Sequence, residues 1–125
     1  MNFVTRSRSE TPDAIAPDGS EVRLLATAKR GSMAEFRLPP GAVSRPVAHR
    51  TVEEVWCFTA GRGRMWLKAG DVEEVIDARP GVSITIPVGA AFQFRCDGGE
   101  ALVAIGVTMP PWPGMDEAYD VQGIW

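Results

Sequence analysis

The sequence has little cysteine: Cys57 and Cys96 are the only two in a chain of 125 residues. Small secreted domains that depend on disulfides carry more cysteines at shorter spacings. We therefore expect both thiols to be reduced and buried. A chain of this length suits a single domain, and folding at this size buries about two-thirds of the surface of the unfolded chain.

Long apolar runs and blocks of basic charge are also missing. No stretch approaches the ~20 apolar residues of a membrane-spanning helix, and residues 1–13 lack the apolar core of a signal peptide. The 13 basic and 16 acidic residues give a net charge of −3 and form no basic stripe of the kind that binds nucleic acid. These absences favour a cytoplasmic protein without a membrane or nucleic-acid partner.

Helical periodicity is absent too, and short stretches with strand character replace it. Many of them alternate apolar and polar residues with a period of two, and Gly- and Pro-rich turns separate them at almost regular intervals. The stretches are residues 21–27, 33–38, 47–49, 53–59, 64–68, 72–77, 82–87, 91–95 and 100–109. Eight or nine short strands in this arrangement indicate an all-β protein, an antiparallel sandwich or barrel.

The two ends of the chain differ from this pattern. Residues 1–20 are polar and predict an N-terminal arm with at most one edge strand, followed by a barrel over residues 21–109. Residues 110–125 contain three prolines within four positions, which forbid a sheet interior, and three large aromatic residues, Trp112, Tyr119 and Trp125. Because such aromatics are rarely left in water, we expect this tail to pack on the barrel or on a partner subunit.

Histidine occurs once, at His49, and Glu54 follows it five residues later. Neutral imidazole and carboxylate are both good ligands for transition metals. The same two groups also form a candidate acid–base pair. The pair alone leaves both interpretations open.

The spacing around this pair resembles the first motif of the cupin superfamily, G-x5-H-x-H-x4-E-x6-G. Gly41, His49, Glu54 and Gly61 are in register, and Val47 stands at the first histidine position. The second motif, G-x5-P-x-G-x2-H-x3-N, follows with Gly81, Pro87 and Gly89 in register, with Phe92 at the histidine position and Cys96 at the asparagine position. The resemblance covers roughly residues 20–108 and implies an antiparallel jelly-roll (cupin) β-barrel.

In cupins that bind metal, the motif residues hold Mn, Fe, Ni, Cu or Zn inside the barrel. Here the resemblance carries over only two ligands, His49 and Glu54, because Val47 and Phe92 cannot bind a metal. Catalytic zinc sites normally use three protein ligands, and Glu53 and Cys57 point to the opposite face of the strand from Glu54. We therefore expect no tightly bound metal cofactor, with a weakly bound divalent transition metal at His49 and Glu54 as the alternative.

The alternation of side chains predicts what surrounds the pair. Residues expected to line a small apolar cavity with His49 and Glu54 are Val47, Trp56, Phe58, Met65, Leu67, Phe92 and Phe94. Side chains that simply fill the barrel are the alternative. Arg45, Arg50 and Arg95 are candidates for contacting a substrate carboxylate or phosphate at the mouth. A Glu54 carboxylate beside the ring should raise the pKa of His49.

These features favour a protein that binds a small organic or sugar-like molecule, with His49 and Glu54 providing metal-independent isomerase, epimerase, cyclase or lyase chemistry. Two alternatives remain: a metal-dependent cupin enzyme (dioxygenase, isomerase or lyase) with an atypical site, and a non-catalytic binding or sensory module. The resemblance also implies a homodimer.

Overall fold

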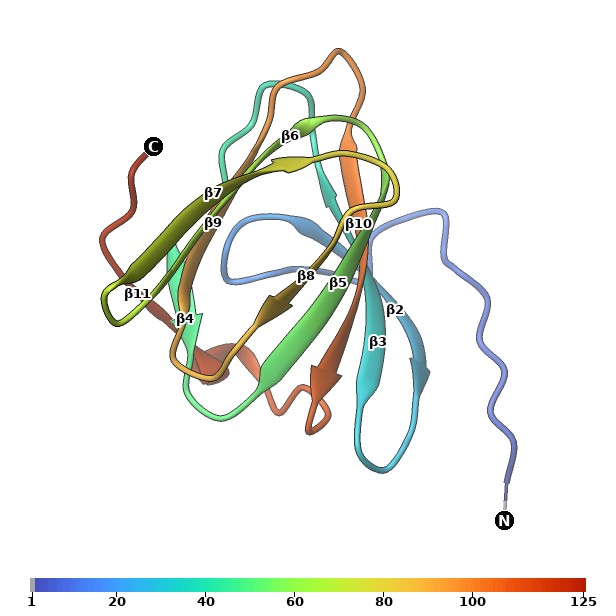
Figure 1. The fold of residues 1–125 in the computed structure, drawn as a ribbon. Helices are drawn as coiled ribbons and strands as arrows, with labels where there is room; N and C mark the ends of the chain where they lie inside the picture. Colours follow the sequence, from blue (N-terminus) through green and yellow to red (C-terminus); the bar gives the residue numbers. More distant parts are fainter. Residues whose placement is uncertain (1) are drawn as a thin grey trace.

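A computed structural model describes residues 2–125, whose regular structure consists of strands and one short 3-10 helix (Figure 1). The strands are β1 (Ala14–Ile15), β2 (Glu21–Thr27), β3 (Ser32–Leu38), β4 (Val47–His49), β5 (Glu53–Ala60), β6 (Gly63–Ala69), β7 (Val72–Ala78), β8 (Ser83–Ile86), β9 (Ala91–Cys96), β10 (Leu102–Met109) and β11 (Ala118–Asp120). The helix η1 spans Met115–Glu117. None of the described helices is long and apolar enough to cross a membrane.

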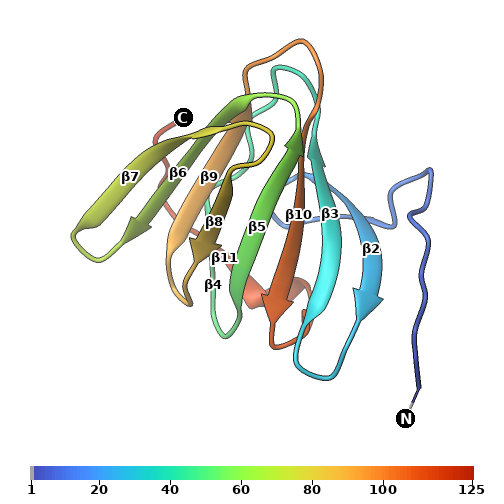
Figure 2. The ribbon, with the colours of Figure 1, turned by 45° about the vertical axis from the view of Figure 1, so that its right-hand side comes forward.

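The strands form two antiparallel sheets (Figure 2). One has the order β1-β2-β3-β10-β5-β8 and the other the order β11-β4-β9-β6-β7. Buried side chains from both sheets, including Leu38 and Phe58 from the first and Met65 and Phe94 from the second, form one core. The predicted antiparallel all-β jelly roll is confirmed. Strand β1 is the one edge strand allowed for the arm, whereas β11, three residues in the tail, was not predicted because it shows no alternating pattern.

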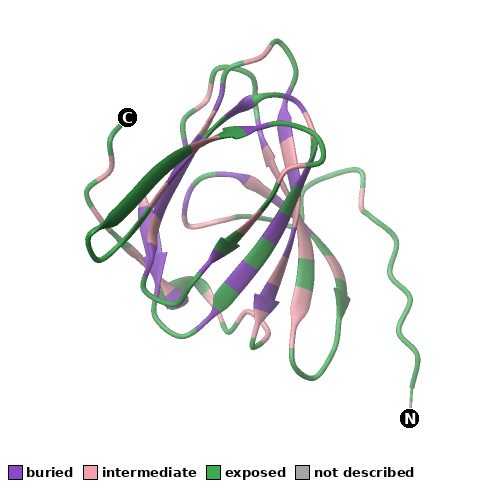
Figure 3. Ribbon diagram, viewed as in Figure 1, coloured by how far each residue is buried: buried purple, intermediate pink, exposed green. Residues whose placement is uncertain are grey.

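Strand β5 shows why the barrel interior can be read from the sequence. Its residues alternate between exposed and buried along the strand, visible as bands in Figure 3. Glu54, Trp56 and Phe58 point inward, whereas Val55 and Cys57 point outward. The expectation that both thiols are buried is therefore wrong for Cys57, which is exposed, and right for Cys96.

The N-terminal arm joins the first sheet over much of its length. The Arg23 guanidinium donates hydrogen bonds to the backbone carbonyls of Ser9 and Glu10, at 3.0 and 2.8 Å. Strand β1 then pairs with β2. Asp18 is buried and accepts hydrogen bonds from the backbone and hydroxyl of Ser20, at 2.9 and 2.6 Å. The arm thus contributes to the wall of the barrel before the first long strand begins.

The C-terminal tail packs on its own barrel. Strand β11 pairs with β4, and the buried Glu117 carboxylate accepts hydrogen bonds from the backbone N–H groups of Thr51, at 2.7 Å, and Val52, at 3.4 Å. At the end of the chain, the Gln93 amide oxygen accepts hydrogen bonds from the backbone of residues 124 and 125, at 3.0 and 3.1 Å. The homodimer expected from the resemblance stays a prediction.

Candidate functional site

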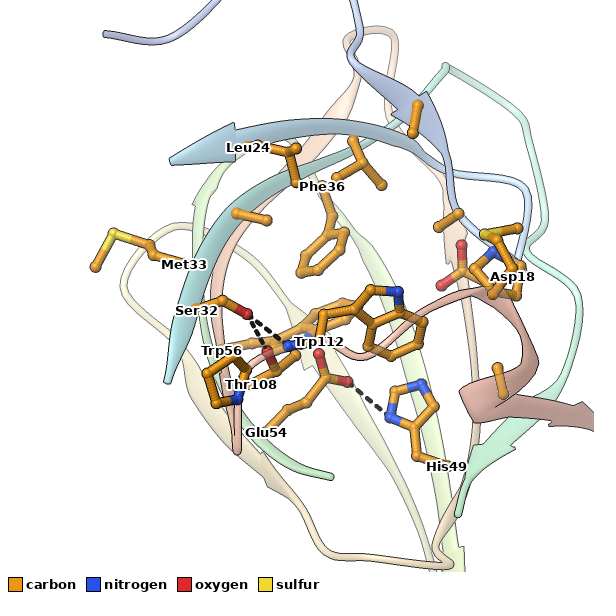
Figure 4. Close-up of a pocket in the computed structure, with 18 of the residues that line it drawn as sticks. Asp18, Leu24, Ser32, Met33, Phe36, His49, Glu54, Trp56, Thr108 and Trp112 are labelled. Carbon is orange, nitrogen blue, oxygen red and sulfur yellow. Dashed lines mark hydrogen bonds and ion pairs between the residues drawn. The ribbon is translucent and has the colours of Figure 1, made fainter. Parts of the chain in front are cut away.

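His49 and Glu54 meet inside the barrel. His49 ends β4 and Glu54 is the second residue of β5, so a three-residue turn, residues 50–52, connects them. Their Nδ1 and Oε2 atoms lie 3.3 Å apart, and their side chains are 6% and 2% exposed (Figure 4). Because the Glu117 carboxylate binds two backbone N–H groups of the connecting turn, the tail helps to fix the geometry of the pair.

The pair faces a cavity of about 310 Å³. Three of the residues expected to line it do so: Val47, Trp56 and Phe92. Other residues in its wall come from the arm (Arg6, Ile15, Asp18), from β3 (Ser32, Ala34, Phe36), and from β10 and the tail (Thr108, Trp112). The arm and the tail therefore form part of the cavity wall together with the strands.

Four residues expected in the cavity wall lie elsewhere. Phe58, Met65 and Phe94 are fully buried in the core, and Leu67 packs against that core. The Trp56 indole, which lines the cavity, packs edge-on against Phe58 and Phe94 at centroid distances of 6.2 and 5.3 Å. Side chains therefore fill the part of the barrel around Phe58 and Phe94, as the alternative expected, whereas the cavity lies beside Trp56.

The three arginines proposed for the mouth do not line the cavity. The Arg45 side chain pairs with Asp120 on β11. Arg50 lies over the Tyr119 ring, 4.8 Å from its centroid, and Arg95 lies over the Trp125 ring, at 4.6 Å. They hold the C-terminal tail in place, an arrangement that no spacing in the sequence reveals.

Aromatic packing positions the cavity wall. The Phe36 and Trp56 rings are stacked, with centroids 4.8 Å apart. Gly106 on β10 makes room for this stack, because a Cβ there would lie 2.7 Å from Phe36 Cε2 and 2.8 Å from Trp56 Cδ1. Trp112 of the tail meets the His49 ring edge-on at 5.1 Å, and its backbone N–H donates a hydrogen bond to the Ser32 hydroxyl at 3.0 Å. The unusual density of aromatics in the tail was the one sequence signal for Trp112.

Burial dominates the electrostatics of the pair. Desolvation lowers the pKa of His49 to about 4, although the negative charge of Glu117 opposes the shift. Desolvation raises the pKa of Glu54 to about 8, and Asp18 and Glu117 raise it further, whereas the Trp56 N–H lowers it. The expectation that Glu54 raises the pKa of His49 is therefore wrong. Near neutral pH both groups are mostly uncharged, so Glu54 is an acid and His49 a base.

Three polar atoms around the pair make no hydrogen bond of good geometry within residues 2–125: His49 Nδ1, Glu54 Oε2 and Trp56 Nε1. The Nδ1–Oε2 contact is close but poorly aligned, and the Trp56 N–H faces the Glu54 carboxyl without completing a hydrogen bond. A buried polar group without a partner costs about 1–3 kcal/mol. In a largely apolar wall, such atoms are features that a bound molecule can satisfy.

The side chains at the four motif positions do not fit a tightly held metal ion. His49 and Glu54 supply two donors, while Val47 and Phe92 line the same cavity without a donor atom. No group of three or more His, Cys, Asp or Glu side chains among the described residues is arranged to hold a metal. In addition, the Glu54 carboxyl must lose a proton that its burial favours before it can bind a cation.

Comparison with known proteins finds likenesses in structure only. No protein-family model and no curated protein matches the sequence. Oxalate decarboxylase from Bacillus subtilis superposes with a TM-score of 0.73 at 18% identity, over 90% of this chain and 30% of the other. The capsular polysaccharide assembling protein CapF from Staphylococcus aureus superposes with a TM-score of 0.68 at 17% identity, over 83% of this chain and 32% of the other.

The chain therefore spans about a third of the length of these two proteins. A third likeness covers nearly the whole of both chains. It is an uncharacterized conserved protein with a double-stranded beta-helix domain from Klebsiella pneumoniae, with a TM-score of 0.67 at 12% identity, over 95% of this chain and 91% of the other. At these identities the likeness concerns the fold, and it confirms the resemblance at that level: the chain is a cupin-fold protein built as a double-stranded β-helix.

Proposed function

We propose that this protein binds a small, partly apolar organic molecule in the barrel cavity, and that His49 and Glu54 act on it as a metal-independent acid–base pair. The observation that carries the proposal is that His49, Glu54 and Trp56 line one cavity of about 310 Å³, while their buried Nδ1, Oε2 and Nε1 atoms make no hydrogen bond of good geometry. That volume lies at the lower end of the roughly 300–1,000 Å³ of small-molecule sites.

The protonation states support the chemical part of the proposal. A buried carboxylic acid next to a neutral imidazole provides a proton donor and a proton acceptor at neutral pH. The pKa of Glu54, about 8, lies close to neutral pH, as a general acid requires. Proton abstraction at one carbon and return at the same or another carbon needs no oxidant. This chemistry serves isomerases, epimerases, cyclases and lyases.

Two rival functions predict different results. A metal-dependent enzyme requires a stoichiometric metal that survives dialysis of the untagged protein, and the two-donor site argues against it. A non-catalytic sensory module requires binding without turnover. Glu54→Gln and His49→Gln remove the acid and the base while leaving side chains of similar size. Turnover that these variants lose would distinguish the proposal from this second rival, which has no turnover to lose.

Binding can be tested through the tryptophans. Acetophenone, cyclohexanone, phenol and benzoate should be titrated while the indole N–H signals are followed by NMR. We expect at least one of them to shift the signals of Trp56 and Trp112, which line the cavity. Trp66 is the internal control, because its Nε1 is bound to Glu73 at 2.8 Å outside the cavity. Ala34→Phe should abolish the shifts by filling the cavity, and Thr59→Phe on the outer face of β5 should preserve them.

Catalytic competence can be tested on the same ligands. Exchange of the α-hydrogens of cyclohexanone for deuterium in D₂O should be faster with the wild-type protein than with His49→Gln. No shift of Trp56 or Trp112 by any of the four molecules at millimolar concentration would contradict the binding proposal. Binding without accelerated exchange would favour the sensory alternative.

A further inference from the structure

The cavity wall carries acidic groups but almost no basic ones. Asp18 and Glu54 line it, and Glu117 lies close enough to influence the pKa of both His49 and Glu54. Among the described residues that line the cavity, Arg6 is the only lysine or arginine, and its side chain is 45% exposed and paired with Asp13 at 3.8 Å. A carboxylate or phosphate entering this site would lose its water without gaining a buried cation.

The nearby arginines cannot easily supply that cation. Arg45 is paired with Asp120, and Arg95 is 2.9 Å from Asp97 and stacked on Trp125. The buried Arg23 points to the arm, where it binds two backbone carbonyls. Recruiting any of them would require these contacts to break. The cavity as it stands therefore disfavours anionic ligands.

The polar atoms in the wall also specify what an uncharged ligand must offer. The Trp56 indole nitrogen is a donor only, it is buried, and it makes no hydrogen bond of good geometry among the described residues, although it faces the Glu54 carboxyl. Glu54 Oε2 beside it becomes a second donor when the carboxyl is protonated. A ligand that satisfies them brings an acceptor such as a carbonyl oxygen.

The remainder of the wall suits a flat ring. The stacked Phe36 and Trp56 rings form one side, and Phe92 and Trp112 approach the His49 imidazole edge-on at 5.3 and 5.1 Å. Such surfaces pack well against apolar or aromatic ligands. A sugar, with hydroxyl groups on every side, would leave most of its hydroxyls unpaired here.

We propose that the ligand belongs to the class of uncharged, ring-sized carbonyl compounds, with its carbonyl oxygen accepting a hydrogen bond from Trp56 Nε1 and its ring packed among Phe36, Phe92 and Trp112. This inference rests on the proposed function, since it names the ligand class of the same cavity. It also assigns Trp56 as the residue that orients the ligand relative to His49.

Matched probes of one shape test this assignment. Acetophenone has a carbonyl oxygen, α-methylstyrene replaces that oxygen with a CH₂ group, and benzoate adds a negative charge. At pH 6 the wild-type protein should bind acetophenone at least tenfold more tightly than benzoate and roughly fivefold more tightly than α-methylstyrene, the value of one net hydrogen bond. The signals of Trp112 report binding in every variant.

Trp56→Phe removes the donor and keeps a ring. It should reduce the ratio of the affinities for acetophenone and α-methylstyrene to near one. A general loosening of the cavity would weaken the binding of both ligands and leave this ratio unchanged. Val55→Ala, next to Trp56 but facing outward, should leave the ratio unchanged. Equal or tighter binding of benzoate, or an unchanged ratio in Trp56→Phe, would overturn the ligand class while leaving the binding proposal intact. Failure of all three probes to bind would overturn the ligand class, and the binding proposal would fall with it only if cyclohexanone and phenol also failed to bind.

Discussion

A Val47→His/Phe92→His double variant is expected to bind a divalent transition metal at least tenfold more tightly than the wild-type chain. Val47 and Phe92 are directly paired across β4 and β9, and both line the cavity together with His49 and Glu54. The two substitutions therefore complete a four-donor set in place. Together the two added ligands should contribute more than ~1.4 kcal/mol, which is tenfold in affinity.

Calorimetric titration with Zn²⁺, and the visible spectrum of bound Co²⁺, would measure this gain. The affinity should rise with pH, because burial raises the pKa of Glu54 to about 8 and the bound metal must displace its proton. Val55→His, which adds a histidine to the outer face of β5, serves as the control and should give no gain. If the double variant binds no better than this control, the four positions do not converge and the motif alignment fails.

Deletion of residues 111–125 is expected to lower the melting temperature by roughly 8 °C or more. The deletion removes β11 from its sheet, the Glu117 carboxylate from the turn between His49 and Glu54, and Trp112 from the cavity. A loss of about 2 kcal/mol is a conservative sum for these contacts, and a domain of this size shifts by several degrees per kcal/mol.

Thermal unfolding and light scattering on the full and truncated chains test this expectation. Deletion of residues 2–5 is the control, because it removes exposed residues such as Phe3 and Val4, which are 94% and 64% exposed, and leaves Arg6 in place. This control should melt like the full chain. An unchanged melting temperature after deletion of 111–125 would show that the tail is not part of the folded unit, and the packing described for it would be wrong.

The sequence predicts the barrel and the pair at its centre better than it predicts the cavity. Strand periodicity locates the nine long or central strands, and the motif spacing brings Val47, His49, Glu54 and Phe92 to one place. Both signals consist of spacings between residues along the chain. They can therefore be recognised without knowledge of the tertiary structure.

The other walls of the cavity are formed in part by segments that show no strand periodicity in the sequence. Asp18 in the arm and Trp112 in the tail reach the cavity through contacts made by irregular backbone. The pKa of His49 was predicted in the wrong direction, because proximity to Glu54 is visible in the sequence whereas the depth of burial is not. The arginines were misplaced for a related reason, since their partners lie in the tail.

The protonation state of His49 can be measured directly, and we expect the cavity to keep both His49 and Glu54 uncharged near neutral pH. Because the chain contains a single histidine, the ¹⁵N NMR signals of the imidazole in the untagged protein report directly on His49 without assignment. The account predicts that these signals remain those of a neutral ring from pH 8 down to about pH 5 and titrate near pH 4. Titration at about 6.5, the value of a free imidazole, or above it, would mean that the ring is charged beside a Glu54 carboxylate, and would contradict the account.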